Sequence, residues 1–261
     1  MNILTKNERN AIKGLRNREN RLQENRMVVE GNKGVLELLG SSNETQRIYV
    51  TNCHEIDTIR NLALTKGVDI IEVSSKDMEI MSSLRTAPGV LAIGKIANSS
   101  VEDIIANLKD TTRTGVPTLL VLDDLSDPGN VGTLIRTADW FGLAGIICSP
   151  RTADIWNPKT IQSSMGSVFR MPICIADPLN VIATFKLQAV ALDSSGENIY
   201  TSDFMPDAFI VGSESHGVNT DLIDSCSTTW AIPGSGGAES LNAAIAGAVV
   251  SSELARRCSM T

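Results

Sequence analysis

The sequence has few of the residues and none of the motifs that mark most metal-dependent and nucleotide-dependent enzymes. It contains two histidines, no HExxH motif and no paired Cys/His spacing, so nothing indicates a metal site. No GxGxxG or GxxxxGK[ST] loop follows a predicted strand, which argues against a Rossmann dinucleotide site and against a P-loop. No GxSxG elbow is present either, which argues against an α/β-hydrolase.

Features of exported and membrane-embedded proteins are also missing. No run of 18 apolar residues occurs, and the N-terminus has no apolar signal-peptide core. The five cysteines are odd in number, widely spaced and without a CxxC pair, which favours reduced thiols over a disulfide framework. We therefore expect a cytoplasmic protein with no membrane partner.

The net charge of −7 conceals a strong asymmetry along the chain. Residues 1–26 contain seven Lys or Arg and three Asp or Glu, a net of +4, so the other 235 residues carry −11. The composition of this basic segment predicts a helix whose sparse apolar stripe runs through Ile12, Leu15 and Leu22. Two interpretations stay open: a solvated surface helix, or an edge that contacts phosphates.

Strands and helices alternate in two blocks, which predicts an α/β protein with two domains. The boundaries are 1–97 for a small N-terminal domain, 98–115 for a polar linker that begins with a short helix, and 116–261 for a larger C-terminal domain. In the second block the predicted strands are continuous apolar runs, typical of a parallel sheet that is buried on both faces. They span residues 117–122, 144–148, 171–175, 187–192, 208–212 and 228–232. The helices between them are expected at 131–141, 158–163, 179–185, 220–225 and 241–257.

Three polar segments follow the ends of predicted strands in this second block. Ligands bind at that edge of an open α/β sheet, so the three together indicate a site. Each also has a simpler interpretation: Asn130 and Ser240 as helix caps, the glycines of 234–237 as a turn, and Arg136 as a surface residue. The segments read NVGTLIRTAD at 130–139, VGSESHGV at 211–218 and IPGSGGAESLN at 232–242.

As a set, these segments resemble the three signature motifs of the SpoU/TrmH family of S-adenosylmethionine-dependent RNA 2′-O-ribose methyltransferases. The resemblance covers about residues 116–258. The N-terminal block, with VEG at 29–31 and APGVLA at 87–92, resembles the ribosomal-protein-like substrate-binding domain of many members. The resemblance implies a deep trefoil knot, formed by the chain from about Leu192 to Asn242, and a homodimer through the knotted domain. Separately from the resemblance, residues 241–250 are small and apolar apart from Asn242, and this pattern predicts a helix that is buried nearly all round.

The resemblance also implies the site residues. It assigns the catalytic machinery to Arg136, Asn130, Glu214, Ser240 and Asn242. It assigns S-adenosylmethionine binding to Gly212, Ile232, Leu241 and Leu192. Glu214 is expected to orient the site through hydrogen bonds to loop amides or to Arg136, while Asn130 and Ser240 hold the loops.

For Arg136 the family suggests either a general base or an activator of the ribose hydroxyl. An arginine has a pKa above about 12, so freeing its proton near neutral pH costs roughly 8 kcal/mol. We therefore favour a charged Arg136 that clamps a phosphate of the target nucleotide and orients the 2′-hydroxyl. His216 is a candidate substrate contact, although a turn position before Gly217 is the favoured interpretation.

RNA is the expected partner, ribosomal RNA in preference to transfer RNA, with Arg16, Arg18 and Arg21 as the phosphate contacts. A non-catalytic RNA-binding or ribosome-assembly factor that keeps the fold is the alternative. A nicotinamide oxidoreductase is disfavoured because the dinucleotide fingerprint is missing.

Overall fold

The computed structural model describes residues 4–51, 56–110, 112 and 114–259. The described residues form two compact units. Unit 1 contains the described residues of 1–97 together with 154–170, and unit 2 contains those of 98–153 and 171–261. The segment 154–170 therefore belongs to the C-terminal block in sequence but folds with the N-terminal block.

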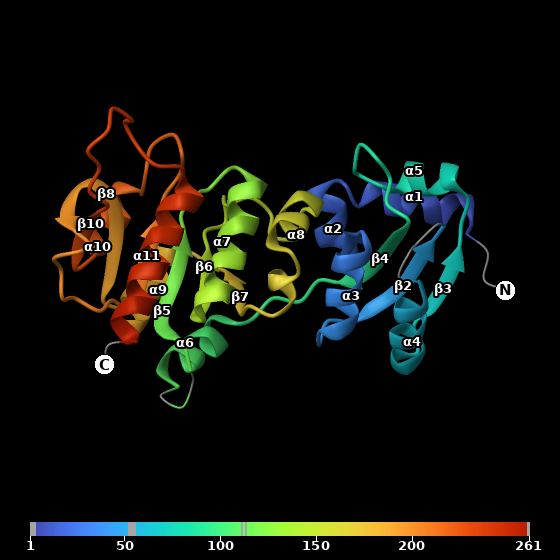
Figure 1. Cartoon of the computed structure of the whole chain (residues 1–261), viewed down its shortest axis with the longest axis horizontal. Coiled ribbons are helices and arrows are strands. Elements are labelled where there is room, and N and C mark those ends of the chain that lie inside the picture. The colour runs from blue at the N-terminus through green and yellow to red at the C-terminus, as the bar shows by residue number, and fades with distance from the viewer. Residues whose placement is uncertain (1–3, 52–55, 111, 113, 260–261) are drawn as a thin grey trace. The chain divides into compact units, whose positions relative to one another are not determined.

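Unit 1 is built on a mixed four-stranded sheet in the order β1-β4-β2-β3 (Figure 1). Strands β1 and β2 are antiparallel to β4, and β2 is parallel to β3. The strands are β1 (Arg26–Glu30), β2 (Thr45–Val50), β3 (Asp69–Glu72) and β4 (Val90–Lys95). The helices are α1 (Lys6–Gly14), α2 (Arg18–Glu24), α3 (Asn32–Gly40), α4 (Ile56–Lys66), α5 (Ser75–Met81) and α8 (Pro158–Ser164), followed by the 3-10 turn η1 (Ser167–Phe169).

The basic N-terminal segment is two helices, which corrects the prediction of one. Helix α1 ends at Gly14, and Asn17 begins α2 by accepting a 2.7 Å hydrogen bond from the Glu19 amide. Ile12 and Leu15 are buried in the core of unit 1, whereas Leu22 is 52% exposed. The apolar stripe does not continue into α2 because the break changes the helix direction.

Strand β1 and helix α3 were not predicted from the sequence. Helix α3 follows Gly31, which has a φ of +87° and provides no side-chain cap. The usual signal for a helix start, a Ser, Thr, Asp or Asn cap, is therefore absent.

Unit 2 is built on a six-stranded sheet in the order β10-β8-β9-β5-β6-β7, and every pair of neighbours is parallel. This confirms the predicted parallel sheet. Its central strands β9, β5 and β6 are buried almost throughout, as expected for a sheet covered on both faces. The strands are β5 (Val116–Leu122), β6 (Leu143–Cys148), β7 (Ile173–Ile175), β8 (Ala189–Asn198), β9 (Ala208–Val211) and β10 (Thr228–Ala231).

Helices cover both faces of this sheet. Helices α7 (Pro128–Phe141) and α11 (Ala243–Cys258) lie side by side on one face (Figure 1). Residues of α6 (Val101–Lys109), α9 (Pro178–Phe185) and α10 (Thr220–Ser225) share a core with the other face. Gly247 permits the close packing of α11 on α7, because a Cβ there would lie 2.3 Å from a Leu134 methyl group.

Helix α11 differs from the expectation in two ways. It begins at Ala243, so Leu241 and Asn242 precede it and are exposed. Only one side is buried in the single chain, since Ile245 is 52% exposed. The apolar pattern predicted burial all round, but packing against α7 and the sheet covers one side alone.

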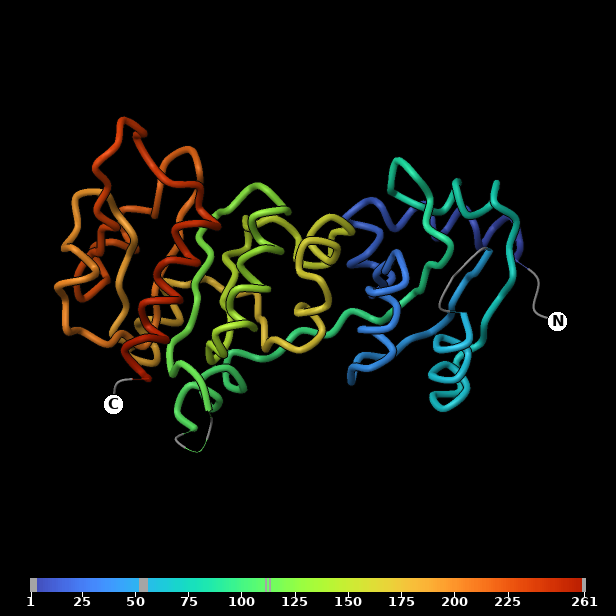
Figure 2. Tube along the Cα trace, in the orientation of Figure 1, coloured from blue at the N-terminus to red at the C-terminus, as the bar shows by residue number. Residues whose placement is uncertain are grey.

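The strand order places a topological switch beside β5. The chain runs outward from β5 to β6 and β7, then crosses to β8 and returns with β9 between β8 and β5. Loops that leave the carboxyl ends of β5 and β9 consequently meet, as in other open α/β sheets. In the Cα trace the segment after β10 leaves the sheet as a long orange-red arch before it enters α11 (Figure 2).

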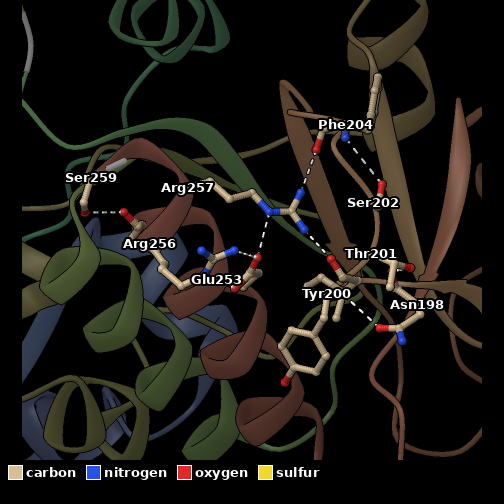
Figure 3. Close-up of polar contacts among 11 residues, drawn as sticks. Asn198, Tyr200, Thr201, Ser202, Phe204, Glu253, Arg256, Arg257 and Ser259 are labelled. Carbon is tan, nitrogen blue, oxygen red and sulfur yellow. Dashed lines mark hydrogen bonds and ion pairs between the residues drawn. The ribbon is translucent and has the colours of Figure 1, made fainter. Parts of the chain in front are cut away.

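The C-terminal end of α11 is fastened to the loop that follows β8 (Figure 3). Arg257 donates hydrogen bonds to Glu253 Oε1 at 2.9 Å, to the Phe204 carbonyl oxygen at 2.9 Å and to the Ile199 carbonyl oxygen. Its guanidinium also lies 5.0 Å from the ring centre of Trp230. Hydrogen bonds from Arg256 and Arg257 outweigh the effect of burial and lower the pKa of Glu253 to about 2.

Among the described residues, no helix has both the length and the apolar character needed to cross a bilayer.

Candidate active site

The first polar segment is the turn between β5 and α7. Asp127 caps α7 by accepting a hydrogen bond from the Asn130 amide at 3.3 Å, and Pro128 occupies the first turn. Asn130 is therefore inside the first turn of the helix and is not its cap. Its side chain is free to reach across to the neighbouring loops.

A chain of side-chain hydrogen bonds joins all three polar segments. Asn130 Nδ2 donates to Glu214 Oε1 at 2.7 Å, and Asn242 Nδ2 donates to Asn130 Oδ1 at 3.2 Å. Asn242 also caps α11, because its Oδ1 accepts from the Ala244 amide at 2.9 Å. Residues 84 and 112 positions apart in the sequence are thus brought together at one edge of the sheet.

Glu214 is the charged member of this network. Its Oε2 accepts bonds of 3.3 Å from both the amide and the hydroxyl of Ser126. Burial raises the pKa of Glu214, but the bonds from Asn130, its own backbone and Ser126 outweigh burial and lower the pKa overall. At neutral pH the side chain is an ionised acceptor that holds the β5–α7 turn, and Arg136 is not among its partners.

The second polar segment is a closed turn after β9. Ser213 and Gly217 exchange two backbone hydrogen bonds of 3.0 and 2.9 Å. Gly212 has no room for a side chain, because a Cβ there would lie 2.2 Å from the Gly217 carbonyl carbon. His216 bonds to the Ser215 hydroxyl through Nδ1 at 2.7 Å, and it is exposed on the turn.

The part of the third polar segment that precedes Asn242, residues 232–241, forms no hydrogen bond within the described part of the chain. This includes Ser240, which the structure leaves outside the network. A Cβ on Gly234, Gly236 or Gly237 would meet nothing within 4 Å. The backbone donors and acceptors of this arch are therefore available to a ligand.

These features fit the S-adenosylmethionine site expected from the sequence. The arch supplies unpaired backbone groups for an adenosine, and Leu241, 49% exposed, supplies apolar surface beside them. Ile232 lies just after β10 and Leu192 lies within β8, and both are half-buried. Gly212 allows the closed turn to approach the strand end closely.

Arg136 stands apart from the network. It is six residues after Asn130 on α7, about 9 Å further along the helix axis. Its side chain is exposed and makes no hydrogen bond or ion pair with any described residue. Trp140, one turn later, is 82% exposed. The arginine is a free cation on an exposed helix surface.

Sequence reasoning missed a polar cluster under the β5–α7 turn. Asp123 is buried and accepts a 2.8 Å bond from the Asn219 amide, and burial raises its pKa. Asp124 has a φ of +57° and accepts bonds from the Ser149 hydroxyl at 2.6 Å and from Arg151. The sequence signal for this cluster was the pair of acidic residues directly after a buried strand. Asp123 and Asp124 hold the β5 turn against the loops after β6 and β9.

The structure corrects the assignment of Arg21 as an RNA contact. Its side chain is 1% exposed and forms an ion pair with Asp154, whose Oδ2 accepts from Arg21 Nε at 2.9 Å. Arg21 Nη1 also donates to the carbonyl oxygens of Leu15 and Arg16. A guanidinium with this many internal partners cannot reach a phosphate.

The other two arginines of that set differ from each other. Arg16 is exposed, but its guanidinium donates to the carbonyl oxygens of Ile80 and Ser82. Arg18 is exposed and has no hydrogen bond or ion pair with a described residue. Of the three, Arg18 is the one positioned to bind a phosphate.

No group of three or more His, Cys, Asp or Glu residues within the described ranges could hold a metal ion. Four cysteines are free thiols: Cys148, Cys174, Cys226 and Cys258. Cys53 lies outside the described residues.

Comparison with known protein families gives two matches, one in each half of the chain. Residues 117–252 match the SpoU rRNA Methylase family, and residues 8–92 match the MRM3-like substrate binding domain. A protein of Mycobacterium sp. (strain KMS), named an uncharacterized tRNA/rRNA methyltransferase, is 31% identical over 95% of this chain and 82% of its own length.

Two further relatives carry more specific descriptions. The 23S rRNA (guanosine(2553)-2′-O)-methyltransferase RlmP of Bacillus subtilis (strain 168) is 28% identical over 91% of this chain and 92% of its own. The crystal structure of an AdoMet-bound rRNA methyltransferase from Sinorhizobium meliloti superimposes with a TM-score of 0.84 at 27% identity. That match covers 98% of this chain and 97% of the other.

Proposed function

The chain belongs to the SpoU rRNA Methylase family, and we propose that it methylates a ribose 2′-hydroxyl of ribosomal RNA with S-adenosylmethionine. The observation that carries the proposal is the Glu214–Asn130–Asn242 network, which ties the three polar segments into one site at the switch point of the sheet. The similarity to an AdoMet-bound rRNA methyltransferase supports the choice of cofactor.

When bound, S-adenosylmethionine supplies an electrophilic methyl group on a sulfonium. In the proposed site the backbone of 232–241 and the Gly212 turn hold the adenosine, with Ile232, Leu241 and Leu192 beside it. The Asn130 and Glu214 side chains keep the two neighbouring loops in register, so that the reacting oxygen is presented in a fixed position. Positioning of this kind supplies up to about 7–11 kcal/mol of the barrier reduction.

Arg136 is proposed as a phosphate clamp that orients the 2′-hydroxyl. Its freedom from internal partners supports this role, since a planar guanidinium then has all its donors for a bidentate phosphate contact. Arg136→Lys discriminates the clamp from a general base. Lysine loses a proton more easily but cannot form the planar fork, so a fully active Lys variant contradicts the clamp.

We also propose that residues from about Leu192 to Asn242 form a trefoil knot and that two copies assemble through the knotted domain. Exposed apolar side chains on and beside neighbouring helices support the dimer: Trp140 on α7, Ile245 on α11 and Leu241 just before α11. Sedimentation equilibrium of the protein and of Trp140→Ser with Ile245→Ser tests it. A wild-type chain that sediments as a monomer at micromolar concentration contradicts it.

The N-terminal domain, residues 1–97, is proposed to dock the RNA, with the 98–115 segment as the connection to the methyltransferase domain of 116–261. The match to a substrate binding domain at 8–92 supports this division of labour. Arg18 is proposed as a phosphate contact. Arg21 is not, because it is buried and ion-paired with Asp154. The reaction is proposed to take place in the cytoplasm.

A methylation assay tests the function directly. The protein is incubated with total unmodified RNA and methyl-labelled S-adenosylmethionine, and 2′-O-methyl sites are mapped by their resistance to alkaline hydrolysis. We expect label at a ribosomal RNA nucleotide, lost in Asn130→Ala and kept in Thr133→Ala, an exposed residue on the same helix. Binding of S-adenosylmethionine without transfer to any RNA favours the non-catalytic alternative.

A further inference from the structure

Unit 1 contains a cavity of about 260 Å³ that none of the assigned site residues lines. Its lining residues come from the end of β1 and the start of α3, from Leu84, and from α8 and the turn after it. All of its lining residues belong to unit 1, although α8 comes from the methyltransferase part of the sequence. Helix α8 is thus part of a site that the N-terminal domain alone would lack.

The wall formed by α8 is held in place by buried and close contacts. The Arg21–Asp154 ion pair fixes the start of the segment, and an Arg170–Glu37 ion pair fixes its end to α3. Between them Gly166 approaches α3 so closely that a Cβ there would lie 2.5 Å from Glu37 Cγ. The position of α8 beside the cavity is therefore fixed by several contacts within unit 1, and not by a single surface side chain.

The lining combines apolar surface, side-chain amides and one free cation. Leu84, Ile161 and Met165 provide the apolar surface, and Met165 is 38% exposed. Gln162 is exposed and its side chain makes no hydrogen bond with a described residue, so its amide is available as both donor and acceptor. Lys33 is exposed, has no ion pair with a described residue, and also lines a second cavity of about 420 Å³ along α3.

We propose that this cavity receives one unstacked nucleobase of a single-stranded RNA segment, with Gln162 bonding to the base edge and Lys33 to an adjoining phosphate. Proteins recognise single-stranded RNA by splaying a base out, stacking it on aromatic or arginine side chains and bonding to its edge. In this cavity the apolar side chains of Leu84, Ile161 and Met165 would pack on the base in place of an aromatic ring. The one carboxylate in the lining, Glu30, is occupied by the hydroxyls of Ser82 and Ser83 and by the Ser83 amide. The proposal rests on the proposed RNA methyltransferase function and adds a recognition subsite to it.

Fluorescence anisotropy with the full-length protein tests the proposal. The probe is a fluorescein-labelled, mixed-sequence single-stranded RNA of about 16 nucleotides. Gln162→Trp fills the cavity, and we expect it to weaken RNA binding about tenfold. Lys33→Gln is expected to weaken it about threefold and to lower the salt slope by about 0.7. Matched controls are Gln23→Trp on α2 and Lys76→Gln on α5, both exposed and outside the cavity, which should bind as the wild type does.

Two further arms identify the source of the base. Free nucleoside monophosphates are added as competitors, and RNA containing 4-thiouridine is photo-crosslinked so that the modified peptide is identified by mass spectrometry. Crosslinks within residues 158–166, with no competition by free nucleotides, support an RNA-strand subsite. Competition at micromolar nucleotide concentration overturns it in favour of a free-nucleotide site.

The outcomes separate this proposal from the function itself. If the wild type methylates and binds RNA while Gln162→Trp and Lys33→Gln match their controls, the cavity proposal is wrong and the function stands. If the wild type neither binds nor methylates RNA, both are wrong. Thermal melting of each variant checks the fold. Gln162→Glu leaves the cavity open but replaces the amide donor with a carboxylate, so it should also weaken RNA binding.

Discussion

Arg21 and Arg136 are both helical arginines that the sequence offered as contacts for RNA, and the structure places them in opposite circumstances. Arg21 on α2 is buried, ion-paired to Asp154 and bonded to two backbone carbonyl oxygens. Arg136 on α7 is exposed and has no partner among the described residues. One guanidinium has used its donors to build the fold, and the other keeps them for a ligand.

The difference teaches that charge in a sequence does not indicate availability. Arg21 belongs to a basic segment that was predicted to be helical and Arg136 to another predicted helix, yet the partner of Arg21 lies 133 residues away in the chain. The same contrast separates Arg257, which is bonded to Glu253 and two carbonyl oxygens, from Arg18, which has no hydrogen bond or ion pair with a described residue. The four arginines therefore make a set of variants with opposite expected phenotypes.

The largest effect is expected at Arg21. Arg21→Met leaves the Asp154 carboxylate buried without its partner, which should lower the free energy of unfolding by about 3–5 kcal/mol. Urea unfolding followed by circular dichroism measures the change. The double variant Arg21→Met with Asp154→Leu removes both charges and should recover most of the loss; a double variant as unstable as the single one would show that packing, not charge, dominates.

Arg136 is expected to show the reverse pattern, a catalytic loss without a stability loss. Arg136→Ala should lower methyl transfer by about 10²–10³-fold, the usual consequence of removing one preorganised donor. The midpoint of urea unfolding should stay at the wild-type value because no internal contact is lost. Methyl transfer by Arg136→Ala at the wild-type rate would show that this residue takes no part in the mechanism. Thr133→Ala, on the same helix, is the control variant.

The hydrogen bonds from Arg256 and Arg257 to Glu253 predict a pH dependence of stability. The folded pKa of Glu253 is about 2, below its ordinary value of 4.5, so its stabilisation is fully present above about pH 5 and is lost as the pH falls towards 2. Glu253→Gln should cost about 2 kcal/mol at pH 7. The gap between wild type and variant should narrow between pH 5 and pH 3, and a gap that is constant over this range would show that the charge is not responsible.

The smallest effect is expected at Arg18. Arg18→Gln removes one exposed cation, which should weaken RNA binding about two- to threefold and lower the salt slope by about 0.7. Anisotropy titrations over a range of salt concentrations measure both. A salt slope of Arg18→Gln equal to that of the wild type would mean that α2 is a solvated helix. Arg18→Gln and Arg136→Ala should both leave stability nearly unchanged, because neither side chain has a hydrogen bond or ion pair with a described residue.

Much of unit 2 was predictable because its signals are local. The apolar runs at 117–122 and 144–148 correspond to β5 and β6, and the strand-turn-helix pattern at 127–141 corresponds to α7. Strand β1 and helix α3 were missed because Gly31 offers no capping signal. The break between α1 and α2 was missed because the composition of residues 1–26 favours helix throughout.

The candidate site was predicted as a set of residues but not as an arrangement. Asn130, Glu214 and Asn242 were expected to act together, and the structure joins them. Ser240 was expected to hold a loop, but it precedes the true cap, Asn242, and forms no bond. Asp123 was not among the expected site residues, and its hydrogen-bond donor, the Asn219 amide, comes 96 residues later in the chain.

By itself the sequence determined the parallel sheet, the order of its elements and the family motifs, since periodicity and motif spacing are properties of neighbouring residues. Only the tertiary structure decided which charges are free. It placed residues 154–170 in unit 1, paired Asp154 with Arg21, and left Arg136 exposed. The physical reason is that the availability of a charged group depends on burial and on partners distant in sequence, which no local pattern specifies.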